Sequence, residues 1–174
     1  MKKIIALILA LMCCGCFFAC TDDAAGGNNN DNEPAYKIDE NATFEDVDIV
    51  AIKDKMIAEL EIDDAMDMGD NVIRGYGIAD EDIKEKACFI TMGGTFVSES
   101  IIIKAKDADA AKRVAEKLEV RLTALLEQAK GYDPSEYEVA QECEVKTYGH
   151  IVTLFFAPKH QGMTEIVEST LAAK

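Results

Sequence analysis

The feature that most constrains the fold is a set of apolar residues between positions 108 and 130 that recur at steps of three and four. This spacing places them on one face of an α-helix, whose opposite face carries charged residues. Asp107 can cap the start of this helix, and Gly131 and Pro134 mark its end. A helix of about 23 residues is ~35 Å long, and its apolar stripe needs a second layer, which we expect to be a sheet. The stripe consists of Ala111, Val114, Leu118, Leu122, Leu125 and Ala129.

Four segments are predicted to be the strands of that sheet. Residues 87–92 and 98–105 are rich in apolar and β-branched side chains, and a glycine pair between them predicts a turn, so they are expected to form a hairpin. Residues 142–147 and 151–157 form a second pair around a three-residue break. The last of these strands is an almost continuous apolar run, which is typical of a strand buried on both faces.

Two further helices are predicted to flank these elements. Residues 46–60 follow Thr43, which has an acid at the spacing of a capping box, and residues 164–173 form a closing helix. The glycine-interrupted, acidic stretch at 61–86 allows only short helical turns. The order helix, strand, strand, helix, strand, strand, helix predicts an α+β fold, a two-layer sandwich in which a mainly antiparallel four-stranded sheet has helices on one face.

The N-terminus predicts export followed by lipid attachment. Two lysines precede an apolar stretch at 4–18, which suits an export signal and is shorter than the ~20 residues that span a bilayer. Ala19 and Cys20, followed by polar residues, resemble the lipobox of bacterial lipoproteins, so Cys20 is predicted to carry acyl chains such as palmitate. Cys16 is the alternative lipidation site. An ordinary secretory signal or a short anchor with incidental cysteines is the competing interpretation.

The predicted organisation is a signal peptide at 1–19, a disordered tether at 20–43 and a single α+β domain at 44–174. The tether is rich in Asp, Asn and Gly, and its first part contains no large apolar residue that could offset the entropy of ordering. Removing the signal takes away two lysines and no acid, so the net charge goes from −15 to −17. Such a surface repels nucleic acid and anionic lipid. We therefore expect the lipid alone to hold the protein at the outer, extracytoplasmic face of the cell membrane.

Several segments in one order and spacing carry a family resemblance: Tyr76-Gly77-Ile78 before acids, 98–107 leading into the long helix, and 131–137 before 148–152. Together with the N-terminal signal, they resemble the bacterial lipoproteins catalogued as domain of unknown function 4358. The resemblance covers residues 46–157 in addition to the signal. It implies an exported, lipid-anchored α+β domain, and it brings no catalytic residues.

No catalytic residue, metal site or cofactor is predicted from the titratable residues. His150 and His160 stand near predicted turns and are interpreted as solvated. Cys88 and Cys143 lie in apolar, strand-like contexts. Export would permit a disulfide between them, whereas a free buried cysteine behaves as a small hydrophobe, and the sequence leaves both states open.

One candidate ligand contact is a pair of tyrosines, Tyr132 and Tyr137, on either side of Pro134. Exposed aromatic side chains in this arrangement could form a lip for a ligand or glycan. The alternative is that they anchor a loop to the sheet.

The leading functional hypothesis is a non-enzymatic binding or protein-interaction module at the cell envelope, with an exported protein or a cell-wall component as partner. The alternative is an envelope-acting peptidoglycan hydrolase, or an accessory to one, that uses carboxylates of the loop at 61–82. A third possibility is an inhibitor or pro-segment-like partner of a larger exported protein. Two buried carboxyls in a pocket would favour the hydrolase, because glycoside hydrolysis uses such a pair, and solvated acids would favour binding.

Overall fold

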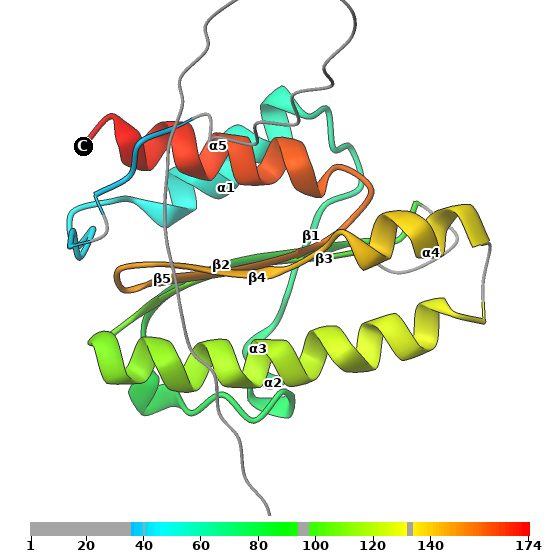
Figure 1. The fold of residues 1–174 in the computed structure, drawn as a ribbon, viewed down its shortest axis with the longest axis horizontal. Helices are drawn as coiled ribbons and strands as arrows, with labels where there is room; N and C mark the ends of the chain where they lie inside the picture. Colours follow the sequence, from blue (N-terminus) through cyan, green and yellow to red (C-terminus); the bar gives the residue numbers. More distant parts are fainter. Residues whose placement is uncertain (1–35, 40, 94–97, 132–133) are drawn as a thin grey trace, which may run out of the picture. The chain divides into compact units, whose positions relative to one another are not determined.

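An antiparallel sheet forms the middle layer of the domain (Figure 1). The computed structural model describes residues 36–39, 41–93, 98–131 and 134–174. The sheet has five strands in the order β1-β2-β3-β5-β4. They are β1 (Met66–Asp67), β2 (Ile83–Thr91), β3 (Ser98–Ala105), β4 (Val145–Tyr148) and β5 (Ile151–Phe156).

Helices cover both faces of this sheet (Figure 1). On one face lie α3 (Ala108–Ala129) and α2 (Asp70–Gly75), and on the other lie α1 (Ile49–Glu59) and α5 (His160–Ala172). Successive residues of β3 enter different cores, with Ile101 and Ile103 facing α3 and Ile102 facing α1 and α5. Every residue of β3 and β5 is buried.

The predicted α+β class and antiparallel sheet are confirmed, but the predicted number of strands and the predicted layers are wrong. The sheet has five strands rather than four, since the two-residue β1 pairs with Phe89 and Ile90 of β2. Helices pack on both faces rather than one, so the sandwich has three layers and not two. The physical reason is that the two central strands are apolar on both faces, and each face needs its own cover.

The long helix and the hairpin follow the sequence pattern closely. Asp107 caps α3 by accepting a hydrogen bond from the amide of Ala110 at 2.8 Å. The hairpin of β2 and β3 is also confirmed, although β2 begins at Ile83, four residues earlier than predicted. After α3 the chain forms a further helix, α4 (Pro134–Gln141), which was not predicted. Proline suits the first turn of a helix as well as the region after its end.

The start of α1 differs from the predicted capping box. Asp48 caps the helix, since its carboxylate accepts hydrogen bonds from Val50 and Ala51 at 3.0 Å. The helix therefore begins at Ile49 rather than at 46. Phe44, next to the predicted cap, has a φ of 56° and lies outside any helix. At the other end of the chain, α5 begins at His160, four residues before its predicted start.

The segment just before α1 is held against the sheet by a buried lysine. The ammonium of Lys104, on β3, donates hydrogen bonds to the carbonyl oxygens of Glu45 and Val47 and pairs with the Glu85 carboxylate at 2.9 Å. The same segment passes close to the β4–β5 turn, where Gly149 has a φ of 55°. These contacts secure the beginning of the domain to its central strand.

Candidate functional site

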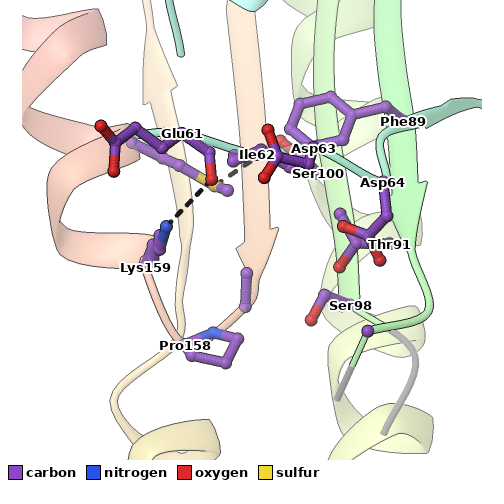
Figure 2. Close-up of a pocket in the computed structure, with 13 residues that line it drawn as sticks. Glu61, Ile62, Asp63, Asp64, Phe89, Thr91, Ser98, Ser100, Pro158 and Lys159 are labelled. Carbon is purple, nitrogen blue, oxygen red and sulfur yellow. Dashed lines mark hydrogen bonds between the residues drawn. The ribbon is translucent and has the colours of Figure 1, made fainter. Parts of the chain in front are cut away.

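A cavity of about 410 Å³ opens at one end of the sheet, on the face covered by α1 and α5 (Figure 2). The ends of β2 and β5, the start of β3, the loop after α1 and the first turns of α5 all contribute to it. The residues that line it are Glu61, Ile62, Asp63, Asp64, Phe89, Thr91, Gly93, Ser98, Ser100, Ala157, Pro158, Lys159 and Met163.

The cavity exists because the sheet presents small hydroxyl side chains at this end. On the face toward α1 and α5, β3 carries Ile102 and then Ser100 and Ser98. Their partners on β2 are Phe89 for Ser100 and Thr91 for Ser98. A serine fills less space than the isoleucine that occupies the equivalent position farther along the strand, so the packed core gives way to an open space.

The floor of the cavity is buried and mainly apolar. Phe89 is 1% exposed and Met163 is 2% exposed. The Ser100 hydroxyl contacts the Met163 sulfur at 3.8 Å. Ser98 is 7% exposed, and its hydroxyl makes no hydrogen bond to any described part of the chain. Figure 2 shows this hydroxyl directed into the cavity.

The loop at the rim is fixed by α5. Lys159 donates hydrogen bonds to the carbonyl oxygens of Leu60 and Glu61 (Figure 2). Glu61 has a φ of 49°, a backbone conformation that costs free energy for a residue other than glycine. Gly162 leaves room for the Leu60 side chain, which would lie 2.9 Å from an added Cβ. The rim is thus held in one conformation by specific contacts.

Two exposed carboxylates stand at this rim. Asp64 accepts a hydrogen bond from the amide of Met92 at 3.1 Å. Asp63 makes no hydrogen bond, and neither acid forms an ion pair with any residue in the described ranges. Figure 2 shows both carboxylates on the side of Phe89 and Thr91, whereas the Glu61 carboxylate points away from them. Among the described lining residues, three acids and one lysine carry charge, so the opening of the cavity is negatively charged overall.

The buried acids lie elsewhere and are paired with arginines. Glu99, 3% exposed, accepts a two-pronged hydrogen bond from Arg121, including one of 3.0 Å from Nε. Asp82, 7% exposed, is bound in the same way by Arg113 at 2.6–3.1 Å, and these hydrogen bonds lower the pKa of Asp82. Both carboxylates bind arginines of α3, so Glu99 links β3 to α3, Asp82 links the turn before β2 to α3, and neither lines the cavity.

The histidines are more buried than the interpretation as solvated side chains allowed. His150 is half-buried, and its Nδ1 lies 2.7 Å from the Glu45 carboxylate. His160 is 8% exposed, and its Nδ1 lies 3.0 Å from the Ala157 carbonyl oxygen. Each side chain therefore has a structural partner within the fold. Among the described residues, no group of three or more His, Cys, Asp and Glu side chains is close enough to hold a metal ion.

Cys88 and Cys143 are both free and buried. Each packs in the core on the α3 side of the sheet. Burial raises the pKa of each thiol to about 11. Of the two states that the sequence left open, the structure has the free, hydrophobic one.

The other predicted site residues are only partly placed. Cys20, its alternative Cys16, and Tyr132 lie outside the described residues. Tyr137 is half-buried on α4 and packs against the core on the α3 side, on the opposite side of the sheet from the cavity. In the part of the chain that the structure describes, no helix is long and apolar enough to cross a bilayer.

The cavity itself was not predicted from the sequence. Ser98 and Ser100 are predicted only as residues of a strand, and the acids at 61–64 belong to the loop whose carboxylates the hydrolase alternative would use. A signal was present in the alternation of Ile102, Ser100 and Ser98 on one face of a strand. This alternation predicts a cavity only when it is also known that α5 and the loop after α1 meet over these positions.

The profile of the family described as Domain of unknown function (DUF4358) matches residues 58–157, which include β1 to β5, α2 to α4 and most of the cavity. No curated protein matches the chain. No solved structure matches it either. Because the match covers more than half of the sequence, the chain belongs to the DUF4358 family.

Proposed function

We propose that this chain is a lipid-anchored extracytoplasmic lipoprotein whose domain is a non-enzymatic binding module at the cell envelope. The observation that carries the binding role is the cavity, which combines the apolar floor of Phe89 and Met163 with the buried hydroxyl of Ser98, which has no hydrogen-bond partner among the described residues. Small-molecule sites are concave and mostly apolar, with a few convergent polar groups, and have volumes of ~300–1,000 Å³.

The proposed attachment rests on the sequence before the domain. The short apolar stretch at 4–18, the Ala19-Cys20 pair and the polar segment after it form the order expected of a lipoprotein signal. Two or more acyl chains make membrane attachment stable, whereas one chain holds a protein only marginally. Lipid on Cys20, with Cys16 as the alternative, would place the cavity outside the cytoplasm within reach of envelope components.

The hydrolase alternative has less support. A hydrolase of glycosidic bonds needs one carboxylic acid whose pKa is raised by burial and a second carboxylate nearby. The acids at the cavity, Asp63 and Asp64, are exposed. The buried acids, Glu99 and Asp82, are held by arginines. Binding therefore accounts for the arrangement with fewer requirements.

Site-specific photo-crosslinking in growing cells tests the binding role. A photoreactive amino acid at Thr91, at the cavity, is expected to give a discrete crosslinked product, while the same group at the exposed Val120 on α3 gives none. Identical products at both positions, or none at Thr91, would contradict a ligand in this cavity.

Fractionation tests the anchor, because Cys20→Ser should move the chain out of the membrane fraction.

A peptidoglycan digestion assay distinguishes a binding module from a hydrolase. Purified peptidoglycan incubated with the full chain is expected to release no soluble fragments. Release of fragments by the unmodified chain, lost in Asp63→Asn/Asp64→Asn, would favour the hydrolase over the binding module.

A further inference from the structure

The Ser98 hydroxyl is the first indication of what the cavity binds. Buried polar groups in folded proteins nearly always have a hydrogen-bond partner, so an exception needs a physical reason. Ser98 is 93% buried, and its hydroxyl points into an open space rather than toward any described side chain. A ligand with a hydrogen-bonding group at this end of the cavity would supply the missing partner.

The apolar floor of the cavity indicates that part of the ligand is aliphatic. Phe89, Met163 and Ala157 present buried apolar surface to the cavity. An aliphatic segment lying on them would be removed from water with a gain of ~25 cal/mol for each Å² buried. Methionine in such a position adapts its shape to the group that it contacts.

The carboxylates at the rim of the cavity favour a ligand with a positive charge. Asp63 and Asp64 have no cationic partner among the described residues, and Lys159 beside them is engaged by the carbonyl oxygens of Leu60 and Glu61. An anionic group would be repelled by these carboxylates and by the overall negative charge of the chain. An ammonium or guanidinium would be attracted and hydrogen-bonded.

We propose, on the basis of the binding role above, that the cavity takes an aliphatic stem that ends in an ammonium or guanidinium group. The cation lies at Asp63, with the neighbouring Asp64 adding negative charge, the stem packs on Phe89 and Met163, and a polar group at the other end of the stem meets Ser98. Figure 2 shows the Asp63 carboxylate apart from the Ser98 hydroxyl, whereas Asp64 lies beside Thr91, the partner of Ser98 on the neighbouring strand. A basic side chain of a peptide has all three parts, and a free alkylamine has only the first two.

Titration with four small probes tests this assignment. The probes are acetyl-lysine amide, acetyl-norleucine amide, acetyl-glutamate amide and pentylamine. The readout is the methyl NMR signal of Met163 in the full chain in detergent micelles, with Met68, in the core on the α3 side, as internal reference. The lysine probe is expected to shift the Met163 signal and to bind at least ~10-fold more tightly than the norleucine probe, which has the same four-carbon chain without the ammonium group.

Substitutions test which residues cause the preference for a cationic probe. Asp63→Asn/Asp64→Asn should remove the advantage of the lysine probe, and Asp64→Asn keeps an oxygen that can accept from the Met92 amide. The matched control, Asp109→Asn/Glu119→Gln, removes two exposed acids from α3 and should leave the advantage intact. Ser98→Ala should weaken the lysine probe but not pentylamine, which would identify a peptide as the source of the cation.

Three results would overturn the assignment. Equal affinity for the lysine and norleucine probes, or tighter binding of the glutamate probe, would refute the cationic ligand and leave a binding cavity. Equal loss of affinity in the α3 control would show that only the overall charge of the chain matters. No shift of Met163 with any probe would refute the ligand class, while a crosslink at Thr91 would still support the proposed function.

Discussion

The buried ion pair between Glu99 and Arg121 permits the sharpest test of how the layers are held together. The Glu99 side chain is 4% exposed and the Arg121 side chain 22% exposed. The guanidinium also stacks on the Tyr76 ring, with Cζ 4.5 Å from the ring centroid. Burial, with the nearby Glu99 charge, raises the pKa of Tyr76 to about 12, so this tyrosine stays neutral at physiological pH.

Removing the arginine should cost much more than neutralising the acid. Arg121→Met leaves the Glu99 carboxylate buried without its cation, which typically costs ~3–5 kcal/mol. Glu99→Gln leaves a guanidinium that can reach water and still has an oxygen acceptor, at a cost of ~1–2 kcal/mol. The double variant has no unpaired charge, so its cost should be at least ~2 kcal/mol smaller than the sum of the two single costs.

Urea denaturation of the full chain, followed by circular dichroism, measures these free energies. Thermal melting gives a second readout, in which Arg121→Met should lower Tm by roughly 10–15 °C at ~3–4 °C per kcal/mol. Additive costs, or a Glu99→Gln variant at least as unstable as Arg121→Met, would refute the reasoning. Either result would mean that Glu99 is solvated or that the pair is not formed.

Three further predictions concern local features. Gly149→Ala should lower the free energy of unfolding by more than ~1 kcal/mol in the same denaturation assay. The reason is that Gly149 has a φ of 55° and that an added Cβ would collide with a backbone carbonyl oxygen. Gly75→Ala is the control and should not destabilise the fold, because there is open space around Gly75. Asp107→Ala should cost ~1 kcal/mol by removing the cap of α3, and Asp107→Asn should cost less. Cys88 and Cys143 should resist alkylation at pH 8 in the folded chain and react after denaturation, as read by peptide mass spectrometry, because burial raises each pKa from 9 to about 11. Since the folded pKa values are the higher ones, stability should decrease as the pH rises from 9 toward 11, and rapid alkylation of the native chain would contradict the burial.

The elements with strong local patterns were predictable. The helix at 108–129 has a cap, an apolar stripe and a terminating glycine within its own sequence, and the structure places its ends within two residues of the predicted ones. The hairpin of β2 and β3 follows from β-branched residues around a glycine pair. Each of these signals lies between residues that are neighbours in the chain, so sequence alone suffices to read it.

Elements that form through contacts with distant residues were either not predicted or predicted with different bounds. The strand β1 is only two residues long and exists because Met66 and Asp67 lie beside β2. Its own sequence, with an acid and no alternation, carries no strand signal. The cap of α1 moved from Thr43 to Asp48 because residues before the helix are held by Lys104 and by the β4–β5 turn. Such contacts join residues that are more than 50 positions apart.

By itself, the sequence determined the α+β class, the antiparallel pairing and the family, and it predicts the export signal and the lipid-bearing Cys20. Only the tertiary structure decided that helices cover both faces and that a cavity opens where the inward residues of β3 change from Ile102 to Ser100 and Ser98. The physical reason is that periodicity shows which side of an element is apolar but not what packs against it. A cavity is space that distant segments leave unfilled, and no local pattern encodes it.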